Sequence, residues 1–337
     1  MTQTLEKPAP PADKSLSSRG GGATGDRVFA ALCVTAGVAV LAILALILFT
    51  TTQQALPALR ESGLGFFTGA DWIANDPDGD GPAGPTFGAR AFIFGTFVVS
   101  AVALVVAVPI SIAIALFLTE LAPRRLRAVA VTVIDLLAAV PSVVFGLWGI
   151  LVVAPALVPV YDWLHGAVGG VPVLGSIFGP PVSSGRSFMT AGLILAIMIV
   201  PIITSISREV FNTVPSAHKQ AAVALGATRW EMIKGAVMPH SFGGLVGGVM
   251  LGLGRAMGET IAVALTIGAA TQITANVLQS GNALPSVIAQ QFGESSGVHR
   301  SALIGLGVVL FVLTVIVNLL ARVVVRRAEI RMKGTAK

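Results

Sequence analysis

The sequence predicts an all-α polytopic membrane protein with six transmembrane helices, and three observations lead to this fold class. Of its 337 residues, 54% are hydrophobic and only 11% are charged, with a mean hydropathy of +0.86. So little charge would leave the surface of a soluble domain uncovered. Six apolar stretches are each long enough to cross a bilayer, and basic residues gather in alternate connections between them.

The first apolar stretch follows a polar N-terminal segment. Residues 1–27 are rich in Pro, Gly and Ser, which predicts a disordered cytoplasmic tail. The run from Val28 to Phe49 would form a helix about 33 Å long, enough to cross a hydrocarbon core of about 30 Å. A cleavable signal has a shorter apolar region, so we expect an uncleaved first transmembrane helix over residues 28–50.

Five further apolar stretches follow and leave no segment for a separate soluble domain. They cover residues 91–118, 129–158, 188–206, 242–270 and 301–325. The sequence therefore predicts an extracytoplasmic loop over residues 51–90, a five-helix transmembrane domain over residues 91–326 and a cytoplasmic tail over residues 327–337.

The positions of lysine and arginine predict how the spans are oriented. Seventeen of the 22 lie in residues 1–27, 119–127, 207–239 and 322–337, whereas four lie in residues 51–90, 160–187 and 272–300. The remaining one, Arg255, lies inside the fifth stretch. Because cytoplasmic loops carry the excess of basic residues, we expect the first group of segments and both termini to face the cytoplasm.

Cysteine, histidine and the placement of the basic residues exclude several kinds of site. The single cysteine, Cys33, lies in an apolar run, so no disulfide is expected within the chain. The four histidines are scattered without metal-ligand spacing, and we expect neither a metal nor another cofactor. The basic residues lie beside apolar runs and form no face interleaved with aromatics, which argues against nucleic-acid binding.

One outer segment partly matches a calcium-binding loop. The matching residues are Asp76, Asp78, Asp80 and Gly81. The twelfth position of such a loop requires a bidentate glutamate but holds Phe87, so the site would lack its strongest ligand. A solvated turn rich in Pro and Gly is the favoured interpretation, and calcium binding stays open.

The connection between the fourth and fifth stretches carries the most informative local pattern, KQAAVALGATRWEMIKGAVMP over residues 219–239. Pro215 suits the first turn of a helix, and Gly226 suits the left-handed position that ends it. Thr228 and Glu231 form the capping-box pattern that starts a second helix. We therefore expect a short helix, a glycine turn and another helix.

This segment resembles the EAA loop of ABC importer permeases. The residues that carry the likeness are Ala221, Ala222, Gly226 and Pro239, and the departure is Gln220, where the family usually has Glu. The resemblance implies that residues 212–239 form a coupling loop whose first helix docks in a groove of a separate ATP-binding subunit. The alternative is an ordinary helix-turn-helix at the membrane surface.

The sequence contains no GxxxxGK[ST] phosphate-binding loop, so we do not expect this chain to hydrolyse ATP. It also lacks a nucleophile–histidine or metal constellation that would support a membrane-bound enzyme. We therefore expect a subunit that is not itself an enzyme, with the ATPase on another polypeptide.

Two ionisable residues in the fifth stretch form the candidate substrate site. An ionisable group costs about 2.5–3.5 kcal/mol at the centre of a span on insertion scales, so its presence calls for a function. Arg255 would lie about 24 Å along a helix from Pro239, with Glu259 following on the same face at i+4. The arginine fork matches the oxygens of an anion, and Glu259 would hold the fork when the site is empty. A purely structural ion pair is the alternative.

Glycines recur at four-residue spacing around Arg255 in this stretch. Such spacing indicates close helix–helix contact, and a glycine-lined path is the secondary interpretation. The glycines are Gly243, Gly244, Gly247, Gly248, Gly252, Gly254 and Gly258.

Asp135 is the third candidate residue of the substrate pathway. It lies eight residues after Arg127, which would place it about 12 Å into the third stretch. Pairing with Arg255 is compatible with this depth but does not follow from it. Pro141 and Pro201 remove backbone donors from two spans, which predicts either bends around a pathway or plain kinks.

Three stretches together resemble the PstC-type permease subunits of phosphate ABC importers, and the likeness extends over residues 87–326. They are LAAVPSVVFGLWGI, LAIMIVPIITSISREVFNTVP and GRAMGETIAVAL. The resemblance implies the type I ABC importer permease fold, inorganic phosphate as substrate, and Arg255 and Glu259 as the family's intramembrane Arg and Glu. It also implies a bacterial inner-membrane location and three kinds of partner: a second homologous permease, two ATP-binding subunits and an extracytoplasmic phosphate-binding protein.

The residues themselves indicate only an anion as substrate. An importer for molybdate or sulfate therefore stays open. An ion-coupled secondary transporter, in which Glu259 or Asp135 relays protons, is the alternative from another class, although it would have no use for the loop at 226–239.

Overall fold

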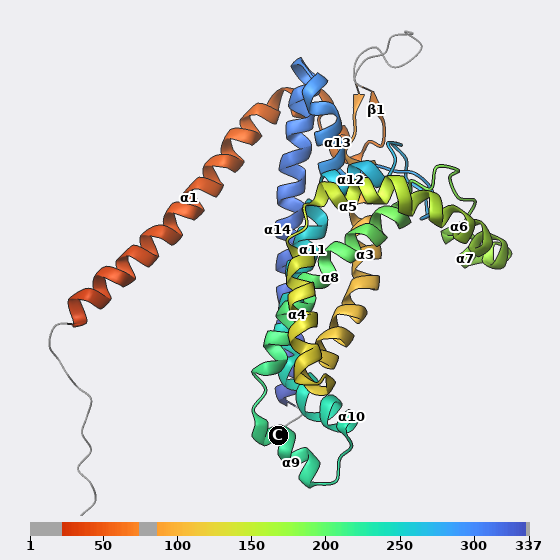
Figure 1. Cartoon of the computed structure of the whole chain (residues 1–337). Coiled ribbons are helices and arrows are strands. Elements are labelled where there is room, and N and C mark those ends of the chain that lie inside the picture. Colours follow the sequence, from red (N-terminus) through yellow and green to blue (C-terminus); the bar gives the residue numbers. More distant parts are fainter. Residues whose placement is uncertain (1–21, 74–85, 335–337) are drawn as a thin grey trace, which may run out of the picture. The chain divides into compact units, whose positions relative to one another are not determined.

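A computed structural model describes residues 22–73 and 86–334 of the protein (Figure 1). Within these ranges six helices are long and apolar enough to cross a membrane, which confirms the predicted number. They are Gly25–Ser62, Arg90–Leu121, Ser142–Val168, Phe188–Asn212, Arg229–Gly258 and Gly297–Val323. The partial calcium-loop match at residues 76–81 lies outside the described residues.

The described elements follow one another in a simple order. The first half of the chain contains α1 (Gly22–Ser62), α2 (Gly65–Thr68), α3 (Arg90–Leu116), α4 (Arg124–Ala138), α5 (Ser142–Trp148), α6 (Ala154–Val168) and α7 (Pro172–Ile177). The second half contains α8 (Phe188–Asn212), α9 (Ser216–Ala224), α10 (Arg229–Met232), α11 (Met238–Gly258), α12 (Ile261–Thr266), α13 (Leu284–Gln291) and α14 (Gly297–Gly334). Two short strands, β1 (Trp72–Ile73) and β2 (Thr86–Phe87), pair antiparallel. Turns of π-helical geometry lie at Phe117–Leu121, Gly149–Val153 and Ile233–Val237, and Phe292–Glu294 form a 3-10 turn.

The contacts divide the chain into two compact units, residues 1–50 and 51–337. In the first unit, the described side chains of α1 are almost all exposed. This helix starts at Gly22, so residues 22–27, expected in the N-terminal tail, are helical. In the second unit, α1 ends at Ser62, and Gly63 follows with a φ of +54°, which glycine adopts without strain.

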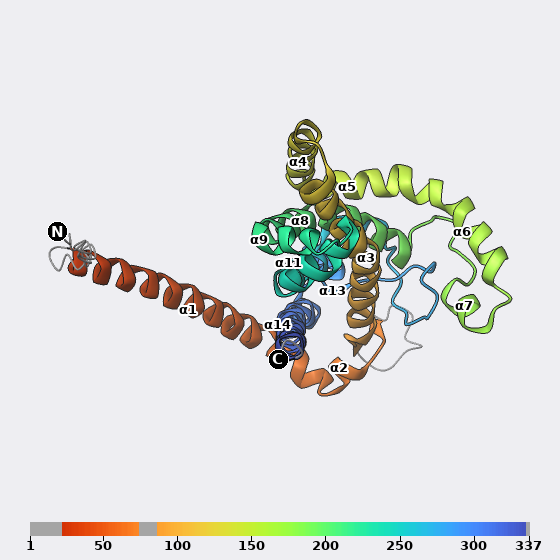
Figure 2. The same cartoon turned by 90° about the horizontal axis from the view of Figure 1, so that it is seen from below.

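The second unit is built around the packing of α8 against α3 and α11 (Figure 2). Small residues allow the close approach, because their side chains add little distance between the helix axes. Ala191 and Ala196 of α8 are fully or almost fully buried in one cluster with Ala103 and Ala107 of α3. These helices therefore form the packed centre of the second unit.

Pro201 lies inside α8, which continues on both sides of it. Hydroxyl groups link α8 to α3 close to this proline, which has no N–H to donate. The Ser111 hydroxyl donates to the carbonyl oxygen of Val200 at 3.2 Å, and the Thr204 hydroxyl donates to the carbonyl oxygen of Ser111 at 3.5 Å. Side chains from two helices thus hydrogen-bond to backbone carbonyl groups near the proline and join α8 to α3.

The third predicted span, residues 129–158, is not one helix. The α4 helix ends at Ala138, and α5 begins at Ser142 after a short break. Pro141 explains the break, because proline disfavours helical conformation in the residue before it and cannot donate to the preceding turn. In Figure 1, α4 follows the long axis of the bundle, whereas α5 turns away from it. The observed membrane-crossing candidate is Ser142–Val168.

The fifth predicted span, residues 242–270, is also divided. The α11 helix ends at Gly258, Glu259 adopts an extended conformation with φ −70° and ψ 128°, and α12 begins at Ile261. The glycine-rich end of α11 has low helix propensity, which favours termination there. The Glu259 carboxylate then accepts a hydrogen bond from the N–H of Ala262 at 3.5 Å, in the first turn of the new helix.

The glycine spacing on α11 places one set of glycines against α8, as predicted. A Cβ atom added at Gly244 would lie 2.5 Å from Cγ2 of Val210, and one at Gly252 would lie 2.7 Å from Cδ1 of Ile203. Three other glycines face open space, with no atom within 4 Å of an added Cβ: Gly247, Gly254 and Gly258. Close helix contact therefore explains one face of α11 and leaves a second, open glycine face.

We expect Gly244→Leu to lower the thermal stability of the purified subunit. Val210 is β-branched and cannot rotate its methyl groups away, and overpacking of this kind costs about 1–3 kcal/mol. Gly247→Leu is the matched control, because it adds the same side chain to the open face three residues away. Equal melting temperatures for the two variants in detergent would contradict the assignment of the α8-facing glycines.

Candidate functional site

The candidate substrate site lies where α11 gives way to α12. Arg255 occupies the last turn of α11 and is exposed, whereas Glu259 follows the helix end and is only 9% exposed. Since Glu259 is outside the helix, the i+4 geometry required for the predicted ion pair does not exist. Among the described residues, Arg208 pairs with Glu209 and Lys219 pairs with Glu120. The predicted ion pair between Arg255 and Glu259 is absent from this described part of the chain.

Without this pair, the two side chains have different surroundings. The Glu259 carboxylate accepts from the first turn of α12, where the helix dipole favours a negative charge. Among the described residues, no hydrogen bond or ion pair engages the side chain of Arg255. Its guanidinium group carries five N–H donors, which are therefore available to a ligand.

Arg255 shares its face of α11 with residues that leave it accessible. Leu251, one turn earlier, is 57% exposed, and the open-face glycines Gly247, Gly254 and Gly258 add no side-chain atoms around it. A charged fork beside a glycine-lined surface is compatible with a path for a small anion. The open face of α11 thus combines the anion site expected at Arg255 with the glycine-lined path, which the sequence suggested as two separate interpretations.

Asp135 lies on α4 and not on α11. It is exposed on α4, a helix without a single buried residue, and this helix packs against α8. The break at Pro141 separates α4 from the membrane-crossing candidate that follows, so Asp135 and that candidate do not form one continuous helix. Among the described residues, no ion pair joins Asp135 to Arg255, and its pathway role stays a prediction.

The predicted helix, glycine turn and second helix are present. Gly226 follows α9 with a φ of +86°, the left-handed conformation expected of it. The Thr228 hydroxyl accepts from the N–H of Glu231 at 3.3 Å, and the Glu231 carboxylate accepts from the N–H of Thr228 at 2.8 Å. The capping box that the sequence predicted is therefore confirmed.

The outer surface of this loop is polar at its start and apolar beyond it. Gln220 and Ala221 are exposed, while Ala222 packs inward against the buried cluster that contains Phe211. The large apolar side chains that follow remain on the surface: Val223 is 53%, Leu225 89% and Trp230 66% exposed. Apolar side chains gathered on one loop in this way indicate an interaction surface.

Pro239 follows a widened turn rather than a regular helical one. Residues Ile233–Val237 form a π-helical turn, and α11 begins at Met238. Proline lacks the N–H that would bind the carbonyl group four residues earlier, so a wider turn relieves the clash between that carbonyl and the ring. The proline of the EAA-like pattern thus marks the place where the loop passes into the fifth span.

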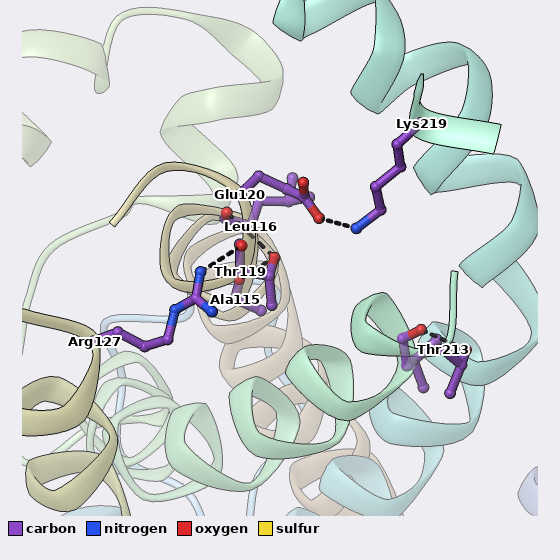
Figure 3. A network of polar contacts seen from close by, with 8 residues as sticks. Ala115, Leu116, Thr119, Glu120, Arg127, Thr213 and Lys219 are labelled. Atoms are coloured by element: carbon purple, nitrogen blue, oxygen red, sulfur yellow. Dashed lines mark hydrogen bonds and ion pairs between the residues drawn. The ribbon is translucent and has the colours of Figure 1, made fainter. Parts of the chain in front are cut away.

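Two contacts that the sequence did not predict link α9 and α4 to the end of α3, and the first of them attaches the loop (Figure 3). Lys219 of α9 forms an ion pair with Glu120, with Nζ and Oε1 2.5 Å apart, and Arg127 of α4 donates to the carbonyl oxygen of Thr119 at 2.6 Å. Both acceptors belong to the π-helical turn Phe117–Leu121 at the end of α3. Side chains from α9 and α4 therefore approach one turn from two sides.

We expect Glu120→Lys to destabilise the loop, because two like charges then face each other. The Glu120 and Lys219 side chains are only 10% and 23% exposed, so the cost should be about 1–2 kcal/mol after allowance for partial solvent screening. The exchanged pair Glu120→Lys, Lys219→Glu should recover most of the unfolding free energy in a double-mutant cycle. Additive effects of the two changes would show that the pair does not couple the elements.

Comparison with known proteins identifies the family. The profile of the family "Binding-protein-dependent transport system inner membrane component" matches residues 107–330. The phosphate transport system permease protein PstC of Xylella fastidiosa (strain Temecula1) is 42% identical over 272 residues, which cover 80% of this chain and 81% of that protein. PstC of Mesorhizobium japonicum is 40% identical over 309 residues, covering 91% of each.

A solved structure supports the fold. One permease chain of a bacterial alginate ABC transporter, crystallised with an alginate pentasaccharide-bound periplasmic protein, aligns with a TM-score of 0.55 at 16% identity and covers 91% of this chain and 96% of that chain. At this identity the likeness concerns the fold alone, and it confirms the predicted type I ABC importer permease architecture. With the profile and the relatives above, the chain belongs to the inner membrane permeases of binding-protein-dependent transport systems, within the PstC family.

Proposed function

We propose that this chain is the permease subunit through which an ABC importer moves inorganic phosphate into the cell. The observation that carries the proposal is Arg255, an exposed arginine beside the α11–α12 break, in a chain whose relatives are phosphate permeases. A guanidinium fork recognises phosphate oxygens through paired, charge-assisted hydrogen bonds. The broken helix supports the proposal, because transport sites are often built at interruptions of membrane helices.

The same proposal assigns partners to two surfaces. The exposed apolar side chains of the loop, with Gln220 and Ala221 beside them, would dock on an ATP-binding subunit, which supplies the energy. The open glycine face of α11 would meet a second, homologous permease, so that Arg255 lies on the path between them. Two ATP-binding subunits and an extracytoplasmic phosphate-binding protein complete the proposed complex.

Uptake by proteoliposomes tests the function directly. Vesicles containing the complex, with ATP inside and the phosphate-binding protein outside, should accumulate radiolabelled phosphate, and vesicles without ATP should not. Accumulation that needs an ion gradient but not ATP would indicate a secondary transporter. Strong competition by molybdate or sulfate would indicate another oxyanion as the substrate.

The proposed orientation, with residues 160–187 and 272–300 outside the cell and residues 207–239 in the cytoplasm, predicts a labelling pattern in intact cells. After Cys33→Ser, single cysteines at Ser184 and Ser296 should react with a membrane-impermeant thiol reagent, whereas one at Ser216 should not. All three serines are exposed, so the side of the membrane and not burial decides their reaction. The reason is the positive-inside distribution of basic residues. The reversed pattern would refute the orientation.

A further inference from the structure

A second basic site is formed by residues of α4 and α8 and does not include Arg255. An open hollow of about 380 Å³ lies between the start of α4 and the end of α8. Arg124, Arg127 and Arg208 contribute three positive charges, and Glu209 is the one carboxylate in the lining. This carboxylate is 69% exposed and only 3.4 Å from Nη2 of Arg208, so it neutralises the hollow poorly.

The arginines have donors to spare. Arg127 uses one Nη2 donor on the carbonyl oxygen of Thr119, while its buried Nε has no partner in the described part of the chain. A guanidinium group carries five donors, so most of those in the hollow are free. A buried donor without an acceptor costs free energy, so the protein alone satisfies this guanidinium group incompletely.

The local charge pattern of α4 conflicts with its helix dipole. Its first turn contains Arg124, Arg125 and Arg127 and no acidic residue, although the N-terminal end of a helix disfavours positive charge. Pro123 precedes it and offers no side-chain acceptor to the free N–H groups of that turn. A sequence that breaks a local rule in this way often does so at a binding site. An anion at this end would satisfy Arg124, Arg127 and the helix terminus together, whereas Arg125 lies outside the lining of the hollow.

We propose that this hollow binds a phosphate group, either as inorganic phosphate or as the headgroup of an anionic phospholipid. Three arginine forks suit the several oxygens of a phosphate better than a single carboxylate or halide. The site goes beyond the proposed transport function, because it involves none of Arg255, Glu259 or the open face of α11. It also lies next to the turn at Phe117–Leu121, which Arg127 and the loop residue Lys219 both contact. Binding there would stabilise the junction of α3, α4 and α9.

The test measures binding with the pathway site disabled. The complex, without the phosphate-binding protein, carries Arg255→Gln in every sample. Radiolabelled inorganic phosphate is measured by equilibrium dialysis, and short-chain phosphatidylglycerol by native mass spectrometry against phosphatidylcholine. We expect the double variant Arg124→Gln, Arg208→Gln to bind one of these two ligands about tenfold more weakly or worse, because two charge-assisted contacts are lost.

The control pair is Arg125→Gln with Arg229→Gln. It removes the same charge from exposed arginines of the α4 first turn and of the loop, outside the lining of the hollow. Binding by this control pair should stay within about twofold of the Arg255→Gln parent. The lysine variant, Arg124→Lys with Arg208→Lys, keeps the charges and should retain most of the binding. Selective loss for inorganic phosphate or for phosphatidylglycerol supports the site and identifies the source of the phosphate. Unchanged binding of both ligands, or equal loss in the control pair, overturns the proposal, whether or not the complex transports phosphate.

Discussion

Arg255→Gln is expected to reduce phosphate uptake about a hundredfold while the subunit remains inserted and assembled. The substitution removes the charged fork but keeps a polar side chain of similar length on an exposed face, so little packing is lost. Loss of one or two charge-assisted hydrogen bonds in the transport step accounts for an effect of this size. The measurement is ATP-driven phosphate uptake in proteoliposomes at matched abundance of the complex.

Variants of the same site separate recognition of the anion from a structural role. Arg255→Lys keeps the charge but loses the planar fork, so we expect reduced rather than absent uptake. Arg322→Gln, at an exposed arginine of α14, is the control for the loss of one positive charge and should transport normally. If the double variant Arg255→Gln, Glu259→Gln takes up phosphate at a near-normal rate, Arg255 does not contact the anion.

Gly226→Val is expected to uncouple ATP hydrolysis from transport or to stop transport altogether. An added Cβ at Gly226 meets no atom within 4 Å, so the conflict is purely conformational: a β-branched residue is strained at a φ of +86°. Relief of that strain would displace α9 and the apolar side chains proposed to dock on the ATPase. ATPase activity and phosphate uptake, measured on the same preparation, report the expected separation.

Two controls isolate the effect of the positive φ. Gly226→Asn should retain most activity, because asparagine enters the left-handed region more readily than other residues that have a side chain. Gly235→Val adds the same side chain at another open position, one without a positive φ, and should be tolerated better than Gly226→Val. Normal coupling in Gly226→Val would mean that the loop only connects two spans.

Local signals in the sequence predicted the features that depend on neighbouring residues. The six spans follow from apolar length, and the capping box of Thr228 and Glu231 lies within four consecutive residues. The left-handed turn at Gly226 follows in the same way from one glycine at the end of a short helix. In each case the physical cause lies within a few residues, so no knowledge of tertiary contacts is needed.

The errors arose where hydropathy continues across a backbone break. Residues on both sides of Pro141 and of Glu259 are apolar, so the length of the apolar run alone shows neither the end of α4 nor the end of α11. Pro141 did predict a bend or kink, and the structure has a helix end there, since a helix seldom passes the residue before a proline. At Glu259 the sequence offered only glycines of low helix propensity, which α11 tolerates elsewhere along its length.

The contact between Lys219 and Glu120 could not be predicted from the sequence. The two residues lie 99 positions apart in the sequence, so no pattern of neighbouring residues relates them. Their contact depends on how α3, α8 and α9 pack, and no local pattern in the sequence indicates that packing. The same holds for the arginines of the hollow, which come from α4 and α8.

The π-helical turn at Ile233–Val237 sets the rotational phase of the whole fifth span. Such a turn accommodates one residue more than an α-helical turn, and one residue corresponds to a rotation of about 100° around the helix axis. If the same residues formed an α-helical turn instead, every later residue would rotate by about that angle, and each position would be taken by the residue before it. Leu251 would then stand where Gly252 meets Ile203, at a place where even one added carbon atom would approach within 2.7 Å, and Arg255 would take the buried position of Ala256. The widened turn beside Pro239 thus allows α11 to lie against α8 at Gly252 and, by the same rotation, turns Arg255 outward.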